Sequence, residues 1–518
     1  MSEVINKHPH NLLQGLSDLS LGHQPVAAPN GDPTVKGPAL VVGYLGTMTI
    51  LVGCIILLPL IMIVFYPQDA GYAHCFIIPG LSAMVVGYLM TLRLKDQRKA
   101  RLEKHQDTAI ILFAWLIAVA ICSLPFLMTG KLNVTQAVFE TTSGLSTTGL
   151  TVINPDVCPH IFLFYRSVLL FFGGVGLVLI MVSALSDSQG MRLYQAEGHN
   201  DRLLPNLARS ARLILSIYSG YIIAGTLALV IAGMPLFDSL NHATAALSTG
   251  GFSVRSGSIG SYNSVAIEAI VIVLMILGST NFMVVVLLLR GRFRAFLKHT
   301  ETRSYAICII AMTVATAAVM LGEGTYSTLP DSLRVAVFQV VSAMSGTGFQ
   351  TVDSFTAMPS SVLFLLTICM LLGGQTGSTS GAIKQVRVAV TMHSLVWSIR
   401  DRFGHRRNVH TYKVNRFGKA DVLSASEQHD MLMYVVLYLT VFLIGSFIFM
   451  LFGYSSQDSM FEFSSALGAV GLSVGITGVD ANPVIMWTAI VGMFVGRLEI
   501  YPVFFGIWRI VKDVSERR

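Results

Sequence analysis

Four stretches of this chain share one pattern of small residues: SGLSTTGLTV at 143–152, ALSTGGFSV at 246–254, SAMSGTGFQTV at 342–352 and GAVGLSVG at 468–475. We call them strings one to four. Each lies between apolar runs and is rich in Gly with Ser or Thr. Aligned on a shared Gly-Leu or Gly-Phe step, the strings place Gly149, Gly251, Gly348 and Gly471 in register. The spacing of about 100 residues predicts four repeated units in one chain.

The composition is that of an integral membrane protein. Of 518 residues, 53% are hydrophobic and only 12% are charged, with a mean hydropathy of +0.66. Soluble domains carry about 25% charged residues, which excludes a soluble globular fold. The net charge of +7 does not indicate nucleic-acid binding, because the basic residues cluster between apolar runs. The six cysteines form no CxxC pair, so neither a zinc site nor a redox motif is supported.

Ten apolar runs are long enough to cross a membrane, which takes about 20 residues. They are 39–66, 73–92, 108–129, 161–185, 213–234, 264–289, 304–321, 361–396, 431–453 and 484–511. We therefore expect an all-α polytopic membrane protein of about ten transmembrane helices. The predicted parts are a cytoplasmic tail at 1–38, two additional N-terminal spans at 39–106, and four span–pore helix–string–span units at 107–190, 191–298, 299–400 and 401–518.

Lys and Arg predict the orientation, because they concentrate on the cytoplasmic side of membrane proteins. Basic loops follow the second, fourth, sixth and eighth spans, at 93–104, 192–212, 290–303 and 400–419. Both termini are therefore predicted to be cytoplasmic, with multi-pass insertion in the cell (inner) membrane. The opposite side carries more acids and only four basic residues, Lys131, Arg166, Arg255 and Arg334. We expect a negative outer vestibule there, which would concentrate cations.

The strings are predicted to line an ion pathway. Extended backbone facing lipid would leave its polar groups unsatisfied, whereas the same backbone can line a water-filled axis. Four strings around one axis would present rings of carbonyl oxygens that replace the hydration shell of a cation. Glycine permits the positive φ angles that turn carbonyls inward. Half helices at 134–142, 237–246, 332–342 and 457–467 would point their negative C-terminal ends at the axis.

Two further motifs lie inside apolar runs. The segment LGGQTGSTSGAIK at 372–384 holds four glycines, and each glycine disfavours a helix by about 1 kcal/mol. An intramembrane loop that obstructs the pore is one interpretation, and a kinked helix is the other. Arg497 is a charge within the last apolar run, where charges are costly and indicate function. We interpret it either as an electrostatic barrier facing the pore or as the partner of an acid on a neighbouring helix.

Together these features resemble the Trk/Ktr/HKT superfamily of potassium transporters. The strings carry the resemblance, as does the 372–384 segment, which is similar to the family's GGxxGSTxGGIK gating loop except that Ala382 replaces a glycine. The two extra N-terminal spans resemble the Trk branch in particular. The resemblance, over about residues 39–511, implies a potassium uptake pore with potassium as the transported substrate and no covalent cofactor. It also implies a homodimer in lipid membrane and a cytoplasmic nucleotide-binding (NAD/ATP-type) regulatory subunit.

On this resemblance we predict two sets of site residues. The potassium filter comprises Thr147, Thr148, Gly149, Thr249, Gly250, Gly251, Gly346, Thr347, Gly348, Ala469, Val470 and Gly471. The gating set comprises Gly373, Gly374, Gly377, Ser378, Thr379, Gly381, Lys384 and Arg497. Glu140 and Glu462 hold matching places in the first and fourth half helices. They are expected either to hydrogen-bond the string backbone or to stand as vestibule charges.

Several alternative functions stay open at this point. A sodium-permeable transporter of the same fold differs only in filter detail, although central glycines in all four strings favour potassium by resemblance. The pore subunit of an ATP-driven potassium pump also has four strings, but it fits Lys384 and Arg497 less well. An enzyme would rest on the GxSxG pattern at 471–475 alone, without the elbow and partners that catalysis needs, so none is predicted.

Overall fold

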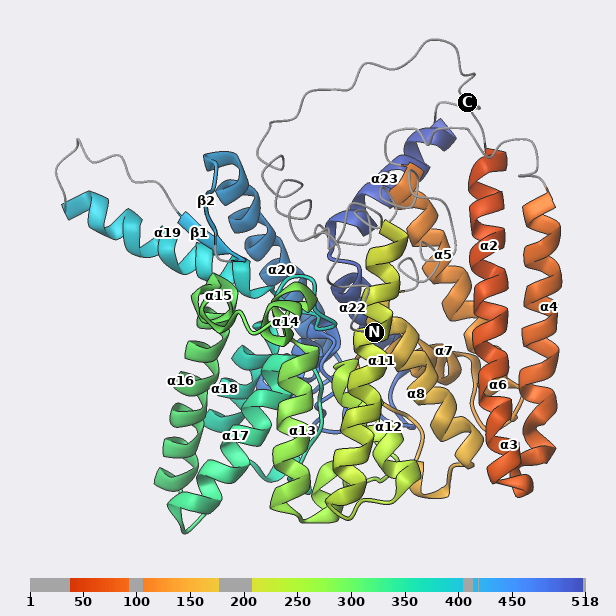
Figure 1. Cartoon of the computed structure of the whole chain (residues 1–518), viewed down its shortest axis with the longest axis horizontal. Helices are drawn as coiled ribbons and strands as arrows, with labels where there is room; N and C mark the ends of the chain where they lie inside the picture. The colour runs from red at the N-terminus through yellow and green to blue at the C-terminus, as the bar shows by residue number, and fades with distance from the viewer. Residues whose placement is uncertain (1–37, 93–105, 177–206, 404–412, 418, 516–518) are drawn as a thin grey trace, which may run out of the picture.

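The computed structural model describes residues 38–92, 106–176, 207–403, 413–417 and 419–515, which form a mostly helical body (Figure 1). Within these residues six helices are long and apolar enough to cross a membrane: Val41–Phe65, Pro67–Thr91, Thr108–Leu127, Arg212–Ile231, Thr300–Gly322 and Ala425–Leu451. Two bent helix pairs bring the number of candidate spans to eight, if each pair is counted as one. A mostly helical membrane fold is therefore confirmed, whereas the predicted number of ten spans is not.

Some of the predictions fall outside the described residues. These are almost all of the tail at 1–38, the basic loop at 93–104, the second half of the run at 161–185, the boundary between the first two units at 190–191, and most of the basic loop at 192–212. The two extra N-terminal spans lie within the described residues. They comprise α2 (Pro38–Leu57), η2 (Leu58–Ile61) and α3 (Met62–Phe65), followed by η3 (Pro67–Tyr72) and α4 (Ala73–Thr91).

Each predicted unit holds a first helix, a short helix, a string and a second helix. Unit one has α5 (Gln106–Cys122), α6 (Leu124–Leu127), α7 (Val134–Leu145), η5 (Pro155–Val157) and α8 (His160–Val175). Unit two has α11 (Leu207–Ile231), α12 (Leu236–Leu247), η6 (Ser258–Tyr262), α13 (Val265–Gly278), α14 (Phe282–Leu289) and α15 (Phe293–Lys298). Unit three has α16 (Thr300–Gly322), α17 (Leu329–Ser345), η7 (Phe355–Ala357), α18 (Ser360–Leu371) and α19 (Gln385–Phe403). Unit four follows the hairpin β1 (Lys413–Arg416) and β2 (Lys419–Val422), and has α20 (Ala425–Leu451), α21 (Ser456–Gly468), α22 (Pro483–Arg497) and α23 (Tyr501–Ser515).

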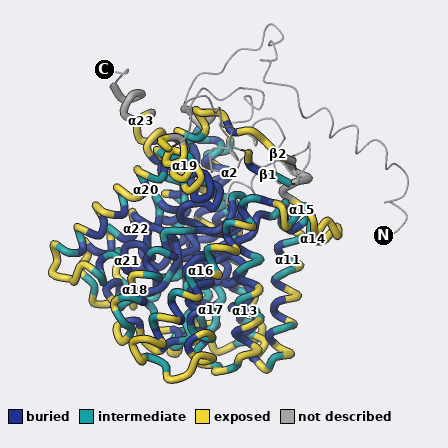
Figure 2. Tube along the Cα trace, turned by 90° about the vertical axis from the view of Figure 1, so that its left-hand side faces the viewer, coloured by how far each residue is buried: buried dark blue, intermediate teal, exposed yellow. Residues whose placement is uncertain are grey.

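The packing of these helices closes into a circle. The second helix of each unit packs against the short helix of the next: α8 against α12, α13 against α17, α18 against α21, and α22 against α7. Because the fourth contact returns to the first unit, the short helices and the strings that follow them surround a common centre. Figure 2 shows that buried residues fill the middle of the body and exposed residues lie at its ends and outer edges.

The expectation that the runs at 264–289 and 484–511 are continuous helices is wrong. The two halves of each run, α13 with α14 and α22 with α23, are bent by 114° and 102°. The Asn281 side chain accepts a hydrogen bond from the backbone N–H of Met283 and so starts a new helix after the first break. At the second break Glu499 and Ile500 have φ of 54° and 33°, which no α-helix contains.

The predicted negative vestibule is also corrected in part. Arg166, one of the four basic residues predicted on the outer side, is only 2% exposed, so its charge does not line an open vestibule. Asp69 is buried and accepts a hydrogen bond from the backbone N–H of Ile161 at 3.0 Å. Asp238 is buried and pairs with Arg255 at 3.3 Å. These two acids therefore stabilise local structure and are not free vestibule charges.

Small residues hold the two N-terminal spans together. An added Cβ on Gly53 would lie 2.7 Å from the Gly80 carbonyl oxygen, and one on Gly87 would lie 2.6 Å from the Gly46 carbonyl oxygen. Glycines at these positions let the backbones of α2 and α4 approach closely, which favours helix association in a membrane.

We predict that Gly87→Ala lowers the thermal stability of the purified protein, because the new methyl group overpacks a backbone contact at a cost of about 1–3 kcal/mol. Gly220→Ala on α11 is the matched control, since an added Cβ there meets nothing within 4 Å. The melting temperature in detergent measures both variants. Equal melting temperatures for the two would contradict the packing described here.

Candidate functional site

The four strings touch one another through their central glycines. An added Cβ on Gly149, Gly251, Gly348 or Gly471 would lie closer than 3.0 Å to a carbonyl oxygen of the next string, namely that of Gly250, Thr347, Val470 or Thr148 respectively. The order runs from string one to two, three and four, and then back to one. Four backbone carbonyls therefore lie in a ring, one beside each central glycine, and there is no room for a side chain between neighbouring strings.

The backbone conformation repeats in the same register as the sequence pattern. The central glycines Gly149, Gly251, Gly348 and Gly471 have φ of 92°, 59°, 82° and 103°. Two residues earlier, Thr147, Thr249, Gly346 and Ala469 have φ of 58°, 53°, 76° and 53°. A positive φ strains any residue with a side chain, by about 1–2 kcal/mol, so three of the four inner positions are held in this conformation by their surroundings.

Glu140 and Glu462 are fully buried behind strings one and four. The Glu140 carboxylate accepts a hydrogen bond from the Thr151 hydroxyl at 2.9 Å. Glu462 accepts one from the Ser473 hydroxyl at 2.8 Å. Glu140 also accepts a hydrogen bond from the backbone N–H of Val152, and Glu462 accepts one from the backbone N–H of Val474, each at 2.9 Å. These contacts match the first of the two predicted roles, and they make Ser473 a structural part of string four.

His242 and Gln339 hold the equivalent places in units two and three, and the sequence reading missed them. His242 Nε2 lies 2.9 Å from the Ser253 hydroxyl, and Gln339 Nε2 donates to the Thr351 hydroxyl at 3.2 Å. All four side chains stand nine residues before a central glycine. Counting back from the glycines would have found them, whereas a search for matching residue types found only the two glutamates.

The 372–384 segment is a loop that closes on itself at its base. The backbone N–H of Gly373 donates to the Ile383 carbonyl at 2.9 Å, and the N–H of Ile383 donates to the Leu371 carbonyl at 3.1 Å. Ala382, where the resembled family has glycine, has φ of 56°. The interpretation as a loop is therefore correct for the backbone, and the kinked-helix alternative is wrong.

The loop lies against the inner ends of three strings. The Thr249 hydroxyl of string two donates to the Thr379 hydroxyl at 3.1 Å. An added Cβ on Gly346 of string three would lie 3.1 Å from the Ser380 hydroxyl. One on Gly381 would lie 3.0 Å from the Ala469 side chain of string four. The loop thus lies directly next to the inner ends of the strings, on the inner side of the ring.

The break between α13 and α14 and the start of α16 anchor the loop. The backbone N–H of Gln375 donates to the Ser279 carbonyl at 2.9 Å. The N–H of Thr376 donates to the buried Glu301 carboxylate at 2.6 Å. The Thr379 hydroxyl lies 2.9 Å from the Gly278 carbonyl oxygen. Glu301 carried no signal in the sequence, because it lies at the start of a span where acids are common.

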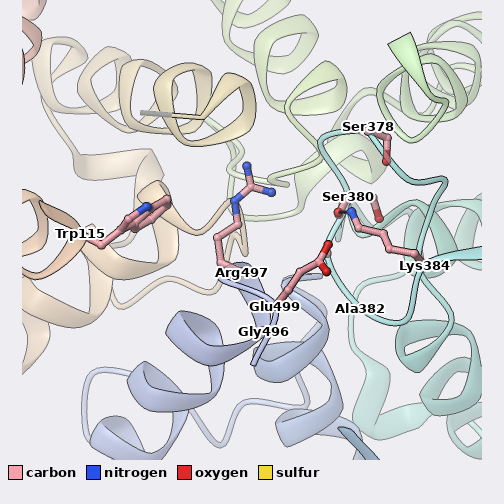
Figure 3. Close-up of a pocket in the computed structure, with 10 residues that line it drawn as sticks. Trp115, Ser378, Ser380, Ala382, Lys384, Gly496, Arg497 and Glu499 are labelled. Atoms are coloured by element: carbon pink, nitrogen blue, oxygen red, sulfur yellow. Dashed lines mark hydrogen bonds between the residues drawn. The ribbon is translucent and has the colours of Figure 1, made fainter. Parts of the chain in front are cut away.

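Arg497 connects the loop to the remaining unit, unit one. Its Nη1 donates to the Thr379 carbonyl at 2.8 Å, and its Nη2 donates to the carbonyls of Gly173 and Gly174 where α8 ends. In Figure 3 the Arg497 side chain reaches between the helices of unit one and the loop. Lys384, in the same cavity, donates from Nζ to the Ser380 carbonyl.

The neighbouring acid Glu499 is engaged with a different cation. Its carboxylate lies 2.7 Å from Arg387 Nη2, and the Arg387 guanidinium lies 3.8 Å above the Tyr434 ring centre. In the sequence, Arg387 comes shortly after the end of the loop, and Glu499 comes shortly after Arg497. This ion pair therefore joins the base of the loop to the bend between α22 and α23, while Arg497 itself faces backbone carbonyls.

A sequence model of the TrkH family, described as cation transport protein, matches residues 76–513. The chain is 28% identical over 470 residues to the Trk system potassium uptake protein TrkH of Salmonella typhimurium, covering 88% of this chain and 95% of that protein. It is 30% identical over 463 residues to an uncharacterized cation transporter of Methanocaldococcus jannaschii, covering 89% of this chain and 93% of that protein.

The fold has a solved counterpart. The structure matches the crystal structure of the potassium transporter TrkH from Vibrio parahaemolyticus with a TM-score of 0.80 and 26% identity, covering 90% of this chain and 98% of that chain. These relatives are named as transporters, and no catalytic activity is indicated. Within the described residues, no group of three or more His, Cys, Asp or Glu side chains could hold a metal ion.

We predict that Thr379→Val destabilises the folded protein by about 1–3 kcal/mol, because the carbonyls of Leu247 and Gly278 share the single proton of this buried hydroxyl and would lose it. Thr376→Val is the control on the same loop, since the buried Thr376 hydroxyl has no hydrogen-bond partner among the described residues. Thermal unfolding in detergent compares the two. A larger loss of stability for Thr376→Val than for Thr379→Val would show that the loop is not held as described.

Proposed function

We propose that this chain, which belongs to the TrkH family of cation transport proteins, takes up potassium through the centre of its ring of strings. The observation that carries the proposal is the closed circle of contacts in which each central glycine abuts a carbonyl oxygen of the next string. Backbone carbonyls arranged around an axis can replace the hydration shell of a cation. Potassium would move down its electrochemical gradient.

In this proposal the filter consists of the central glycines and the two residues before each of them. The positive φ at both ends of each triplet supports this assignment, because a left-handed conformation reorients successive carbonyls. The half helices that precede the strings contribute the negative ends of their dipoles, which favour a cation. Their C-terminal residues are buried next to the strings.

The loop at 372–384 and Arg497 would act as the gate. Two arrangements support this role: the loop contacts the inner ends of strings two, three and four, and Arg497 spans from the loop to unit one. A fixed positive charge on the pathway opposes the passage of cations, and the loop obstructs it sterically. Opening would require the loop to leave its contacts with Ser279 and Glu301.

Orientation and partners complete the proposal. Exposed basic residues such as Arg294 and Lys298 lie on α15, at the end of the units away from the strings, which supports placing this end in the cytoplasm. The proposed setting is the inner membrane, with both termini cytoplasmic. A homodimer and a cytoplasmic nucleotide-binding regulatory subunit are part of the proposal as what the resemblance implies, and the relatives' names support only membership of a Trk system.

We predict that Gly149→Ser reduces the preference for potassium over sodium, because its Cβ would collide with the carbonyl of Gly250 and displace the ring. Gly130→Ser is the matched control: Gly130 also has a positive φ, of 68°, but an added Cβ there meets nothing within 4 Å. Fluxes of potassium and sodium into proteoliposomes under equal gradients give the ratio. An unchanged ratio in Gly149→Ser would refute the filter, and equal fluxes in the unmodified protein would indicate a sodium-permeable transporter.

We predict that Arg497→Ala raises basal potassium flux about tenfold or more, since about 1.4 kcal/mol of lost barrier changes a rate by that factor. The substitution removes both the charge and the donors to the Thr379 and Gly174 carbonyls. Arg294→Ala removes an exposed arginine from α15 and is expected to leave the flux unchanged. If the two variants have the same flux in proteoliposomes, Arg497 is not part of the gate.

A further inference from the structure

We propose that Arg166 is a positioning residue for cation selectivity, and that it fixes strings one and two relative to each other from behind. This inference rests on the proposed filter function of the strings. Arg166 lies on α8 and is 2% exposed, so a full positive charge is held inside the helical body. Buried charges are costly unless they are paired, which raises the question of what this one does.

The first partner of Arg166 is Glu140 on the half helix of unit one. Arg166 Nε lies 2.9 Å from Glu140 Oε1, and the Glu140 side chain has no exposed surface. The same carboxylate accepts hydrogen bonds from Thr151 and from the backbone N–H of Val152, both of which belong to string one. Through Glu140, the guanidinium is therefore connected to the outer half of string one.

The second partner of Arg166 is string two. Arg166 Nη1 donates to the backbone carbonyl of Ser253 at 3.2 Å. The guanidinium carbon lies 4.0 Å from the ring centre of Phe252, which is the residue that follows the central glycine. The contact of Nε with Glu140 is an ion pair without hydrogen-bond geometry, whereas Nη1 and the face of the guanidinium contact string two. A planar, branched cation that makes these contacts together requires the shape of arginine.

The matching positions in units two and four carry no charged side chain. Gly173, Gly278 and Gly496 each pack against the carbonyl of the last leucine in the half helix of the same unit. This shared contact allows the second helices α8, α13 and α22 to be aligned residue by residue. Counting back seven residues from these glycines gives Arg166, Val271 and Ala489. Behind string four, Glu462 is held by uncharged donors, namely Ser473 and Val474 of its own string and Thr477 just after it.

The consequence concerns how the ring discriminates between ions. Potassium and sodium carry the same charge and differ only in size, so a ring of carbonyls selects between them only if its width is maintained. The bridge from Arg166 joins two neighbouring strings just outside their central glycines. Loss of the bridge should let these strings move apart or together, which admits sodium without abolishing conduction.

Arg166→Lys is the sharpest variant for a test. Lysine keeps the positive charge beside Glu140, so the buried carboxylate remains paired, but it lacks the fork that reaches Ser253 at the same time. Arg334→Lys is the matched control. Arg334 donates through Nε and Nη2 to Glu268 at 2.8 and 2.6 Å, a two-pronged pair that lies outside the strings.

The experiment measures potassium and sodium flux into proteoliposomes for the full chain and its variants, with Gly149→Ser as the reference. We expect Arg166→Lys to lower the potassium-to-sodium ratio about fivefold or more, while Arg334→Lys keeps the ratio of the unmodified protein. Melting temperatures report whether each variant is folded. A change in the ratio without a large loss of stability separates positioning of the strings from a general structural role.

Two results would overturn the proposal. If Gly149→Ser changes the ratio but Arg166→Lys does not, the strings are the filter and Arg166 has no part in selectivity. If neither variant changes the ratio, the filter proposal fails and this inference fails with it. Should Arg166→Lys not fold, Glu140→Gln replaces it, because this nearly isosteric change weakens the same bridge at its other end. A lowered ratio supports the proposal, and an unchanged ratio overturns it.

Discussion

The close approach of four backbone segments at one place is the constraint on which the rest of this structure depends. Each central glycine abuts a carbonyl oxygen of the next string, so no larger residue fits at these four positions. Beyond the ends of the half helices the strings are neither helix nor strand, and backbone of this kind cannot face lipid without leaving polar groups unsatisfied. They therefore need a wall of half helices around them, and the second helix of each unit packs against the half helix of the next to supply it.

The same constraint bears on where the second helices α8, α13 and α22 end. Gly173, Gly278 and Gly496 bring these helices against the ends of the half helices, and each helix ends within three residues of that contact. The breaks free carbonyl and N–H groups next to the inner ends of the strings. The loop and Arg497 use these groups, as shown by the bonds to Ser279, Gly173 and Gly174. The cavity beside Arg497 is lined by residues of the loop, by Trp115 and by the end of α22.

Much of this arrangement can be predicted from the sequence, because the features that form it leave local patterns. Four Gly-rich strings in register, the half helices before them and the loop at 372–384 all have compositions that an ordinary membrane helix does not tolerate. Arg497 stood out for the same reason, as a charge in an apolar run.

Other features depend on contacts between distant segments and could not be predicted in this way. The breaks after Gly278 and Gly496 involve only a few residues, so both runs keep the hydropathy of a continuous span. Arg166 was counted among the basic residues of the outer side, and the sequence did not reveal its burial, because its partners come from α7 and string two. The cyclic order of the strings likewise emerges only from their mutual contacts.

The most direct test of the central claim is to locate bound cations in the folded protein. Crystals grown with rubidium in place of potassium would be measured for anomalous scattering. The account predicts rubidium peaks on the axis of the ring, within coordination distance of the carbonyls of Thr148, Gly250, Thr347 and Val470. Rubidium bound elsewhere in the membrane region, with none between the strings, would contradict the claim that these four backbone segments form the potassium pathway.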